Sequence, residues 1–383
     1  MTRQLLNLCG FAILALLTFG YCSQPTVQSL KTRGDQPIST VQSTLSEGFN
    51  SDWSVATEKF KEGLQLTAVQ FVDMKHGWIA GYGGIVYSTA DGGRTWKTSQ
   101  LGTGTNSYVS SISFLADSVG WAAVTRDPTE AMDKRGYRSF VLRTNNAGQS
   151  WQKQRVWDAT QIYKVRFVNN DEGWVVGRKL EDGGLFLSRT TDGGSNWVEQ
   201  SSALFDLPSN DFGTDIYTPE PFRATLLTVE GRIYTTLDGG QNWKQDLAIR
   251  DEPEQTFMAK IGILQNKNLW ALGSTDSKEG MWTTILRHQN DHGLTRFRLD
   301  GVYILDIVFL SEDRLLGSGS MPSSNGALFG SRTGVVLYSS DGGRTWAKIF
   351  RDLHSPRVNA IAVQAGDVWV VGDNGLMIHL SNK

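Results

Sequence analysis

One short motif, Asp-Gly-Gly followed by two residues and a Trp, recurs in strict or near form and restricts the fold of this chain more than any other feature. The copies occupy residues 88–96, 143–151, 189–197, 235–243 and 338–346. Their tryptophans, Trp96, Trp151, Trp197, Trp243 and Trp346, are separated by 55, 46, 46 and 103 residues. Because the last interval is about twice the others, we expect one degraded copy inside it, and residues 287–293 (RHQNDHG) fit that place without the Trp.

A second landmark lies upstream of most copies, where an apolar residue stands seven positions before a Trp. The pairs are Phe71/Trp78, Phe114/Trp121, Phe167/Trp174, Ile263/Trp270 and Ala362/Trp369, with Phe309/Leu316 as a variant. Each unit therefore predicts an apolar strand, a Gly-Trp-type strand, a third strand, the recurring turn and a fourth strand. Four-stranded units of 46 to 55 residues, with no helical stretch between them, indicate a β-propeller.

The number of units and the two chain ends predict how the propeller closes. Starting at Phe71, the chain holds six complete units and a seventh that begins near Ala360 and stops before its fourth strand. Residues 49–57 (FNSDWSVAT), which include Trp53, match the strand that follows each recurring turn. We therefore expect an all-β chain with seven four-stranded antiparallel blades, closed by an N-terminal strand that removes the exposed sheet edge.

The acidic residues of the recurring turn are predicted to be structural rather than catalytic. Asp91, Asp192, Asp238 and Asp341 can accept hydrogen bonds from nearby backbone N–H groups, as in Asx turns. The glycines that follow permit positive φ in a hairpin. The Trp that ends each turn begins the outer strand, and we expect it to pack back over the turn.

Residues 1–22 (MTRQLLNLCGFAILALLTFGYC) combine an early Arg3 with an apolar run, the pattern of a secretory signal. The run ends in Cys22, as in bacterial lipoproteins whose cysteine is lipidated, although Tyr21 stands where a small residue is usual. Lipidation at Cys22, cleavage to a secreted protein and an uncleaved membrane anchor are all open, and each places the body outside the cytoplasm. Residues 23–48, rich in Ser, Thr and Gln, predict a flexible linker before a propeller domain over residues 49–383.

Composition argues against nucleic-acid binding, thiol chemistry and a metal site. The formal net charge of −2 removes the electrostatic basis of a nucleic-acid binder. Both cysteines lie in residues 1–22, so the body has neither disulfides nor a thiol nucleophile. Among five histidines, only His288 and His292 have metal-like spacing, and they fall in the degraded turn. We therefore expect no metal, no cofactor and no nucleic-acid partner.

One face of the predicted propeller carries the longer connections. With strands a to d numbered from the centre outward, the b–c loops and the d–a links share this face, and functional residues tend to lie on such loops. At the channel mouth there we expect four aromatic side chains and several charges of mixed sign. The aromatics either seal the channel as packing or contact a partner. The candidate partner-binding residues are Tyr108, Arg126, Arg135, Tyr163, Phe257, Tyr303 and Arg357.

The units resemble the Asp-box, or BNR, repeat, whose pattern is Ser-x-Asp-x-Gly-x-Thr-Trp. The whole arrangement resembles the photosystem II stability/assembly factor family, with the best copies in residues 71–96 and 167–197 and a likeness that spans about residues 49–382. Members of that family are noncatalytic scaffolds that bind a precursor protein at a membrane. The resemblance implies a monomeric, cofactor-free scaffold for protein partners such as photosystem II precursor subunits, in the periplasm, thylakoid lumen or cell envelope.

A sialidase-like glycoside hydrolase or a carbohydrate-binding propeller is the alternative, because sialidases are also Asp-box propellers. Such enzymes use an arginine cluster, an acid carboxylate and a Tyr–Glu nucleophile pair. Tyr217 and Glu220 stand close together on a predicted long link of the elaborated face, whereas the Arg-Ile-Pro triplet common in these enzymes is absent.

Overall fold

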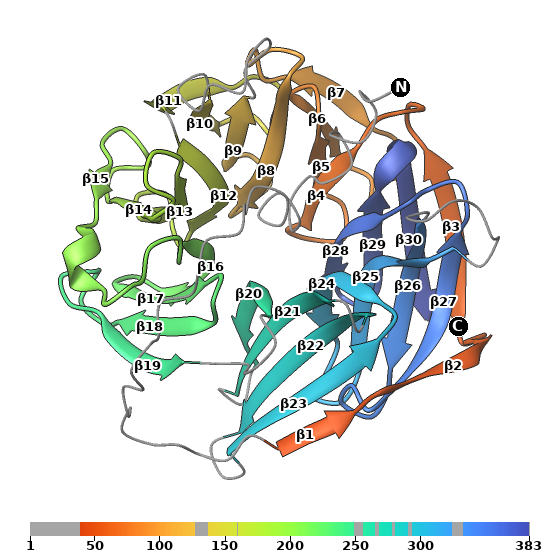
Figure 1. The fold of residues 1–383 in the computed structure, drawn as a ribbon. Coiled ribbons are helices and arrows are strands. Elements are labelled where there is room, and N and C mark those ends of the chain that lie inside the picture. Colours follow the sequence, from red (N-terminus) through yellow and green to blue (C-terminus); the bar gives the residue numbers. More distant parts are fainter. Residues whose placement is uncertain are drawn as a thin grey trace, which may run out of the picture.

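The computed structural model describes residues 39–126, 137–158, 160–248, 256–264, 268–277, 280–289, 293–323 and 332–382. Seven β-sheets stand around a central channel, each with one edge strand beside the channel and the opposite edge strand at the rim (Figure 1). Apart from strands, the described residues form two 3-10 turns, η2 (Ser202–Leu204) and η3 (Asp373–Gly375). The predicted architecture of seven four-stranded antiparallel blades is confirmed.

Blades 1 to 6 take their strands in sequence order from the channel to the rim. Blade 1 contains β4 (Leu66–Phe71), β5 (Gly77–Gly81), β6 (Ile85–Thr89) and β7 (Lys97–Gln100). Blade 2 contains β8 (Ser107–Phe114), β9 (Gly120–Arg126), β10 (Arg138–Thr144) and β11 (Gln152–Asp158). Blade 3 contains β12 (Thr160–Phe167), β13 (Gly173–Lys179), β14 (Leu185–Thr190) and β15 (Val198–Glu199).

The next three blades follow the same order. Blade 4 contains β16 (Gly213–Glu220), β17 (Arg223–Thr228), β18 (Arg232–Thr236) and β19 (Lys244–Ala248). Blade 5 contains β20 (Phe257–Ile263), β21 (Leu269–Ser277), β22 (Gly280–Gln289) and β23 (Gly293–Asp300). Blade 6 contains β24 (Tyr303–Phe309), β25 (Leu315–Pro322), β26 (Arg332–Ser339) and β27 (Thr345–Asp352).

Blade 7 is assembled from both ends of the chain. Its inner strands are β28 (Val358–Gln364), β29 (Asp367–Gly372) and β30 (Leu376–Asn382), and β3 (Trp53–Lys59) supplies the fourth. β3 pairs antiparallel with β30, from Trp53 opposite Asn382 to Lys59 opposite Leu376. The predicted closure by an N-terminal strand is therefore confirmed, and the buried Trp53 belongs to the core between blades 6 and 7.

Two further strands precede β3 where the sequence predicts only linker. β1 (Ser39–Gln42) pairs in parallel with β23, and β2 (Thr44–Phe49) pairs in parallel with β27, so each adds a fifth strand to a blade (Figure 1). The expectation of a flexible linker over residues 23–48 is wrong for residues 39–48. The rim edges of blades 5 and 6 offer backbone groups that need partners, and β1 and β2 supply them. We call residues 39–49 the N-terminal belt.

The N-terminal belt also covers apolar side chains. Val41 and Leu45 pack against the core between blades 5 and 6, which contains Phe297 and Trp346, and Leu45 stands opposite Trp346 in the strand pairing. Under this cover Trp346 is only 1% exposed. The four other tryptophans of the recurring turns are half-buried. The belt therefore adds hydrophobic burial as well as backbone hydrogen bonds.

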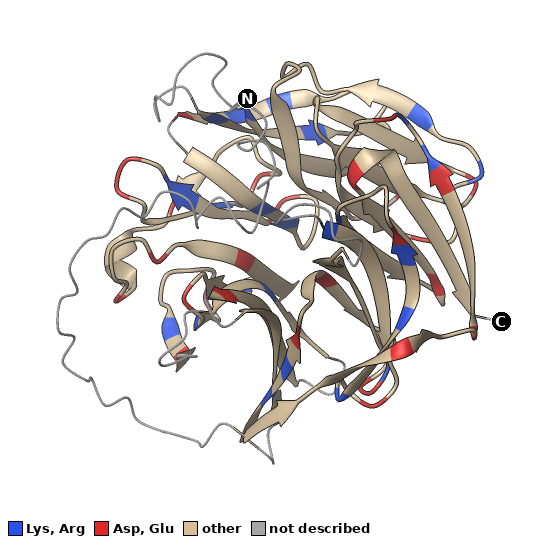
Figure 2. Ribbon diagram, turned by 45° about the vertical axis from the view of Figure 1, so that its right-hand side comes forward, with Lys and Arg blue, Asp and Glu red and all other residues tan. Residues whose placement is uncertain are grey.

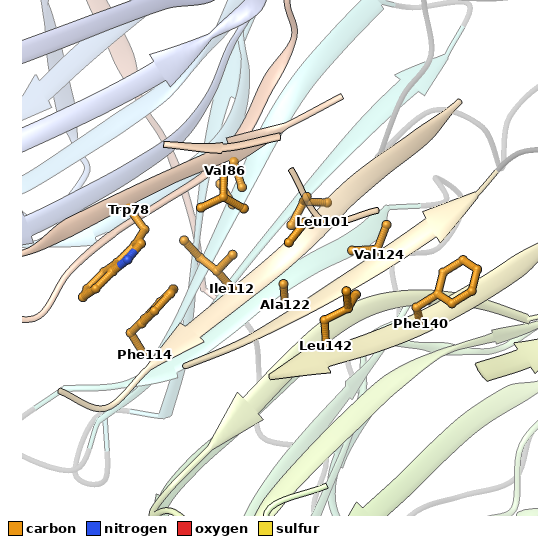
Figure 3. Packing of buried hydrophobic residues seen from close by; sticks show 12 residues of the cluster. Trp78, Val86, Leu101, Ile112, Phe114, Ala122, Val124, Phe140 and Leu142 are labelled. Carbon is orange, nitrogen blue, oxygen red and sulfur yellow. The ribbon is translucent and has the colours of Figure 1, made fainter. Parts of the chain in front are cut away.

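The aromatic landmarks of the repeat hold neighbouring blades together. The Trp of strand b in one blade stacks on the Phe of strand a in the next blade, with ring centroids 3.6 or 3.7 Å apart. The stacked pairs are Trp78 with Phe114, Trp121 with Phe167 and Trp369 with Phe71. Figure 3 shows Trp78 and Phe114 facing each other within one buried cluster.

The glycines before Trp78 and Trp121 follow from the same packing. Phe71 stands opposite Gly77 in the β4–β5 pairing, and a Cβ on Gly77 would lie 2.4 Å from the Phe71 ring. A Cβ on Gly120 would meet Phe114 in the same way, at 2.3 Å. Only glycine leaves room for the ring that the preceding blade's Trp stacks upon.

The recurring turn is held by its acidic residue. In blade 1, Asp91 Oδ1 accepts hydrogen bonds from Thr89 Oγ1 (2.8 Å) and Thr95 N (2.9 Å), and Asp91 Oδ2 accepts one from Thr95 Oγ1 (2.6 Å). The Thr95 hydrogen bonds lower the pKa of the Asp91 carboxyl to about 2. Trp96 Nε1 donates to Gly93 O at 3.1 Å, so the ring packs over the turn. Equivalent backbone bonds are accepted by Asn146, Asp192, Asp238 and Asp341.

Candidate functional site

The central channel holds a cavity of about 200 Å³ to which the inner strands of all seven blades contribute. Its wall includes Thr67 of β4, Tyr108 and Ser110 of β8, Tyr163 and Lys164 of β12, Asp215 of β16, Phe257 and Lys260 of β20, Tyr303 of β24, and Asn359 of β28. Because these residues lie on strands of a closed ring, the backbone fixes their positions relative to one another.

The cavity lies at the end of the channel where the longer connections gather. Tyr82 in the b–c turn of blade 1, Phe212 in the link before blade 4 and Val229 in the b–c turn of blade 4 all line it. So does Asp373, in the b–c turn of blade 7 that contains η3. The cavity therefore belongs to the face that the sequence identifies as elaborated.

All four aromatic candidates line this cavity. Tyr108 and Tyr303 are each 3% exposed, whereas Tyr163 and Phe257 are half-buried. Gln161 joins two of the tyrosines, because its Nε2 donates to Tyr108 Oη (2.7 Å) and its Oε1 accepts from Tyr163 Oη (3.0 Å). Burial raises the pKa of Tyr163 and of Tyr303, so both side chains are neutral phenols at physiological pH.

The three arginine candidates occupy different settings. Arg357 lines the cavity but is only 7% exposed, and its Nε lies 3.1 Å from Asp373 Oδ2. Arg126, at the end of β9, is exposed and lies outside the cavity wall. Arg135 lies outside the described residues. The structure thus brings together the four aromatics and Arg357.

Four charged side chains near the channel axis were not singled out from the sequence. Lys164, Asp215, Lys260 and Asp306 occupy equivalent positions beside an irregularity in the inner strands of blades 3 to 6. The two carboxylates tie blades together. Asp215 accepts from Ile216 N (2.9 Å) and from Ile261 N of the next blade (3.1 Å), and Asp306 accepts from Ile307 N (2.9 Å) and Ile361 N (3.2 Å) in the same way.

The two lysines of this set differ in their pairing. Lys260 Nζ lies 2.9 Å from Asp306 Oδ1, whereas Lys164 Nζ lies 3.8 Å from Asp215 Oδ1. Burial lowers the pKa of Lys164 to about 8, and Asp215 opposes this effect. The sequence carried a signal for both lysines, because each stands three residues before the apolar landmark of its blade.

The Tyr–Glu pair considered for a glycoside hydrolase lies away from the cavity. Tyr217 and Glu220 belong to β16, and Glu220 stands opposite Arg223 at the a–b turn, on the opposite face from the b–c turns. At the surface its carboxylate lies 2.9 Å from Arg223 Nη1. The prediction that this segment forms a long link on the elaborated face is wrong, because the inner strand of blade 4 runs through it.

Charge is mixed over the surface, with Lys and Arg interspersed among Asp and Glu in the ribbon (Figure 2). Within the described ranges, no three His, Cys, Asp or Glu side chains are grouped as metal ligands would be. The same part of the chain has no helix with the length and apolar character needed to cross a membrane. His292, one of the two histidines with metal-like spacing, lies outside the described residues.

Solved structures share this fold. A structure described as YCF48 bound to D1 peptide has a TM-score of 0.61 and 17% identity, over 89% of this chain and 97% of the other. YCF48 from Cyanidioschyzon merolae gives 0.58 and 18%, over 86% and 99%. Virginiamycin B lyase from Staphylococcus aureus gives 0.60 and 12%, over 86% and 99%. At these identities the likeness concerns the fold alone, and a lyase among the matches means that the fold does not decide catalysis.

Similar sequences come from plants and cyanobacteria. The photosystem II stability/assembly factor HCF136 of Oryza sativa is 30% identical over 128 residues, which are 32% of this chain and 29% of the plant protein. The chain thus matches less than a third of this relative's length. A photosystem II assembly lipoprotein Ycf48 of Synechococcus sp. is 24% identical over 309 residues, or 73% of this chain and 80% of that protein.

A family model matches the chain in two long segments. The model described as photosynthesis system II assembly factor YCF48 matches residues 20–128 and 134–279, more than half of the chain. These ranges contain the Asp-box turns of blades 1 to 4 and the cavity residues from Tyr108 to Lys260. Repeat, fold and matched residues therefore agree, and the chain belongs to the YCF48 family of photosystem II assembly factors.

Proposed function

We propose that this chain is a noncatalytic assembly factor that binds a segment of a photosystem II precursor polypeptide in the central cavity. The cavity carries the proposal, because aromatic side chains from five blades and polar groups from the other two converge there. Such a mixture gives apolar contact area together with directed hydrogen bonds, as in sites that bind peptides or small molecules. A relative of the same fold is described as bound to a D1 peptide, which makes a D1 segment the first partner to test.

Under this proposal the candidate residues form two groups, which contact different parts of the bound segment. Tyr108, Tyr163, Phe257 and Tyr303 contact the part of the segment that enters the cavity, and Arg357 holds the wall through Asp373. Arg126, which is exposed at the end of β9, contacts the part that extends outward over the rim, and Arg135, which lies outside the described residues, stays a sequence prediction for the same part.

The cavity's carboxylates support a noncatalytic role. Among the described residues, Asp215 and Asp373 are the acids of the wall. Asp215 accepts two backbone hydrogen bonds, and Asp373 contacts Arg357 Nε and accepts from Asn359 Nδ2 at 2.9 Å. Both carboxylates are thus engaged in holding the fold, whereas a glycosidase needs two carboxyl groups directed at its substrate.

The proposal includes export and a lipid anchor at Cys22. The apolar run before Cys22 and the lipoprotein names of the Synechococcus and Trichormus variabilis relatives support it. Mass spectrometry of the membrane fraction should find a lipidated N-terminal Cys22, and Cys22→Ala should move the protein to the soluble fraction. Cys9→Ala serves as the matched control. An unmodified N-terminus on membrane-bound protein would contradict the anchor.

Peptide binding tests the main proposal. Overlapping fluorescein-labelled peptides that cover the D1 precursor are titrated with the protein, and anisotropy reports binding. We expect one region to bind and Phe257→Ala to weaken it about tenfold or more, since a buried aromatic contact contributes at least that much. Leu237→Ala, which is 67% exposed on the opposite face, should leave binding unchanged.

Two outcomes would overturn the proposal. One is binding of no D1 peptide, or binding that Phe257→Ala leaves intact. The other is cleavage of a fluorogenic sialoside by the wild-type protein, lost in a cavity variant.

A further inference from the structure

We infer that the central cavity accepts a carboxylate of the bound segment and that the Lys164 ammonium pairs with it. The inference deepens the proposed function, on which it rests only for the identity of the partner. The ligand chemistry itself follows from the charges and contacts of the cavity wall.

Lys164 places an ammonium group in the cavity, and the hydrogen-bond donors of this group are largely unused. Its side chain is 18% exposed, and its one ion-pair contact is Asp215 Oδ1 at 3.8 Å, beyond hydrogen-bond distance. Among the described residues its Nζ makes no hydrogen bond. An ammonium group carries three donors, and enclosing them without acceptors is costly.

The Asp215 carboxylate lies near the Lys164 ammonium but does not hydrogen-bond it. Its Oδ1 accepts a hydrogen bond from Ile216 N and its Oδ2 accepts one from Ile261 N, as the two oxygens of Asp306 do from Ile307 N and Ile361 N, yet Asp215 Oδ1 stays 3.8 Å from Lys164 Nζ. Lys260 shows the contrasting arrangement, because its Nζ reaches Asp306 Oδ1 at 2.9 Å. The two lysines at equivalent positions thus differ in their contact with a carboxylate: Lys260 has a close one, and Lys164 keeps its donors for a ligand.

The remaining charges of the wall add to this preference. Arg357 is paired with Asp373, so neither contributes a free charge. Arg332 lies over the Tyr303 ring at 4.3 Å, and its Nη1 has no hydrogen-bond partner within the described part of the chain. Among the described residues, the wall carries the cations Lys164, Lys260, Arg332 and Arg357 against the carboxylates of Asp215 and Asp373, and Asp306 pairs with Lys260. A net positive charge therefore remains, which suits an anionic oxygen pair.

Lys164 also makes binding sensitive to pH. Burial is the main cause that brings its pKa down to about 8. Of the charges that face it, Lys260 and Arg166 lower this pKa, whereas Asp215 and Asp306 raise it. A bound carboxylate favours the protonated amine and raises the Lys164 pKa again. Affinity for a carboxylate should therefore fall as pH rises above about 8.

A small probe tests the chemistry without any partner protein. The full chain with 13C-labelled lysine is titrated with 3-phenylpropionate, an aromatic carboxylate, and with the neutral 3-phenylpropionamide. The Lys164 signal is assigned from the spectrum of Lys164→Gln. We expect the carboxylate, and not the amide, to shift this signal in a saturable way and to raise the Lys164 pKa. Equal shifts from both compounds, or no shift, would overturn the inference.

Modified peptides show whether the carboxylate comes from an acidic side chain or from the C-terminus of the bound segment. The D1 peptide that binds is remade with its acidic side chains changed to amides, and separately with an amidated C-terminus. We expect one of these changes to weaken binding to the wild type about tenfold or more, the size of a charge-assisted hydrogen bond, and to have little effect on Lys164→Gln. Lys260→Gln is the matched control and should retain the preference for the carboxylate.

The outcomes separate this inference from the proposed function. Peptide binding that is equal for acidic and amide forms leaves the assembly role standing and overturns the carboxylate site. A response of Lys164 to 3-phenylpropionate, without binding of any D1 peptide, supports the carboxylate site and overturns D1 as partner. Thermal unfolding of each variant confirms that it is folded.

Discussion

The indole ring of Trp121 lies face to face with the phenyl ring of Phe167, with centroids 3.6 Å apart and ring planes at 5°. The two residues belong to neighbouring blades, and Trp121 Nε1 also donates to Gly193 O in the turn of blade 3 at 3.0 Å. One side chain therefore joins blade 2 to both the inner strand and the turn of blade 3. The packing of blade 2 against blade 3 therefore depends on Trp121.

Trp121→Ala should destabilise the propeller by about 3–5 kcal/mol, the usual cost of removing a buried large aromatic side chain. Trp121→Phe keeps a ring in the stack and loses the hydrogen bond, so its cost should be smaller. Urea unfolding followed by circular dichroism measures both. A loss for Trp121→Ala as small as that of the exposed control Leu237→Ala would contradict the role of the stack.

Asp91 predicts a specific sensitivity to acid. Its folded pKa of about 2 lies below the ordinary value of 3.8, so its contribution is present above pH 4 and is lost as pH falls toward 2. Asp91→Ala should melt at a lower temperature at pH 7, and its melting temperature should fall less between pH 4 and pH 2. Asp91→Asn, which keeps an acceptor as Asn146 does in blade 2, should melt closer to the wild type. Parallel pH profiles for wild type and Asp91→Ala would refute this account.

Lys164 predicts that stability depends on pH in the alkaline range. Its folded pKa of about 8 lies below the ordinary 10.5, so between these values the unfolded chain holds the proton more strongly, and stability should rise with pH. Lys164→Met should lack this rise and should be more stable at pH 7, by at most about 3 kcal/mol at 1.4 kcal/mol per pKa unit. Urea unfolding at pH 7, 8, 9 and 10 measures the difference, with the exposed Lys97→Met as control. A variant less stable than the wild type at pH 7 would be inconsistent with a destabilising buried charge.

Deleting the N-terminal belt alone should have a different effect from deleting the belt together with the closing strand β3. Removing residues 39–49 should leave the ring closed but expose the rim strands β23 and β27, whose amides should then exchange hydrogen faster. Removing residues 39–59 also takes away β3, so blade 7 should open and the whole domain should unfold cooperatively at lower temperature. Hydrogen-exchange mass spectrometry and calorimetry measure these effects. A 39–59 deletion that melts like the intact protein would contradict closure by β3.

The repeat made the blades and their closure predictable, because every blade carries a Trp landmark or the recurring glycine turn at a regular spacing. The belt was not predictable in this way. Residues 39–49 contain Val41 and Leu45 but no regular alternation of apolar residues, since much of their pairing uses backbone groups at the edges of two distant strands. A polar composition therefore does not distinguish an edge strand from a linker.

The candidate site was predictable in part. The aromatics were found because each precedes its landmark on an inner strand, which places it near the channel. Lys164 and Lys260 share a position relative to the same landmarks, but a difference of 3.8 Å against 2.9 Å in their pairing cannot be read from sequence. The placement of Glu220 was wrong because the inner strand of blade 4 extends through a Pro-containing segment that resembles a link.

The N-terminal belt also determines how the molecule bears a mechanical load. Under the proposed anchor at Cys22, a pull on the chain would reach Ser39, which stands opposite Thr295 near the start of β23, with β1 running parallel to that strand. A pull along the strand direction loads the four β1–β23 residue pairs in shear, and shear must break them together rather than one after another. β2 lies next along the chain, paired with β27, so tension dissipates in two blades before it reaches β3. With such an anchor, the belt would keep tension on the N-terminus away from β3, the strand that closes the ring.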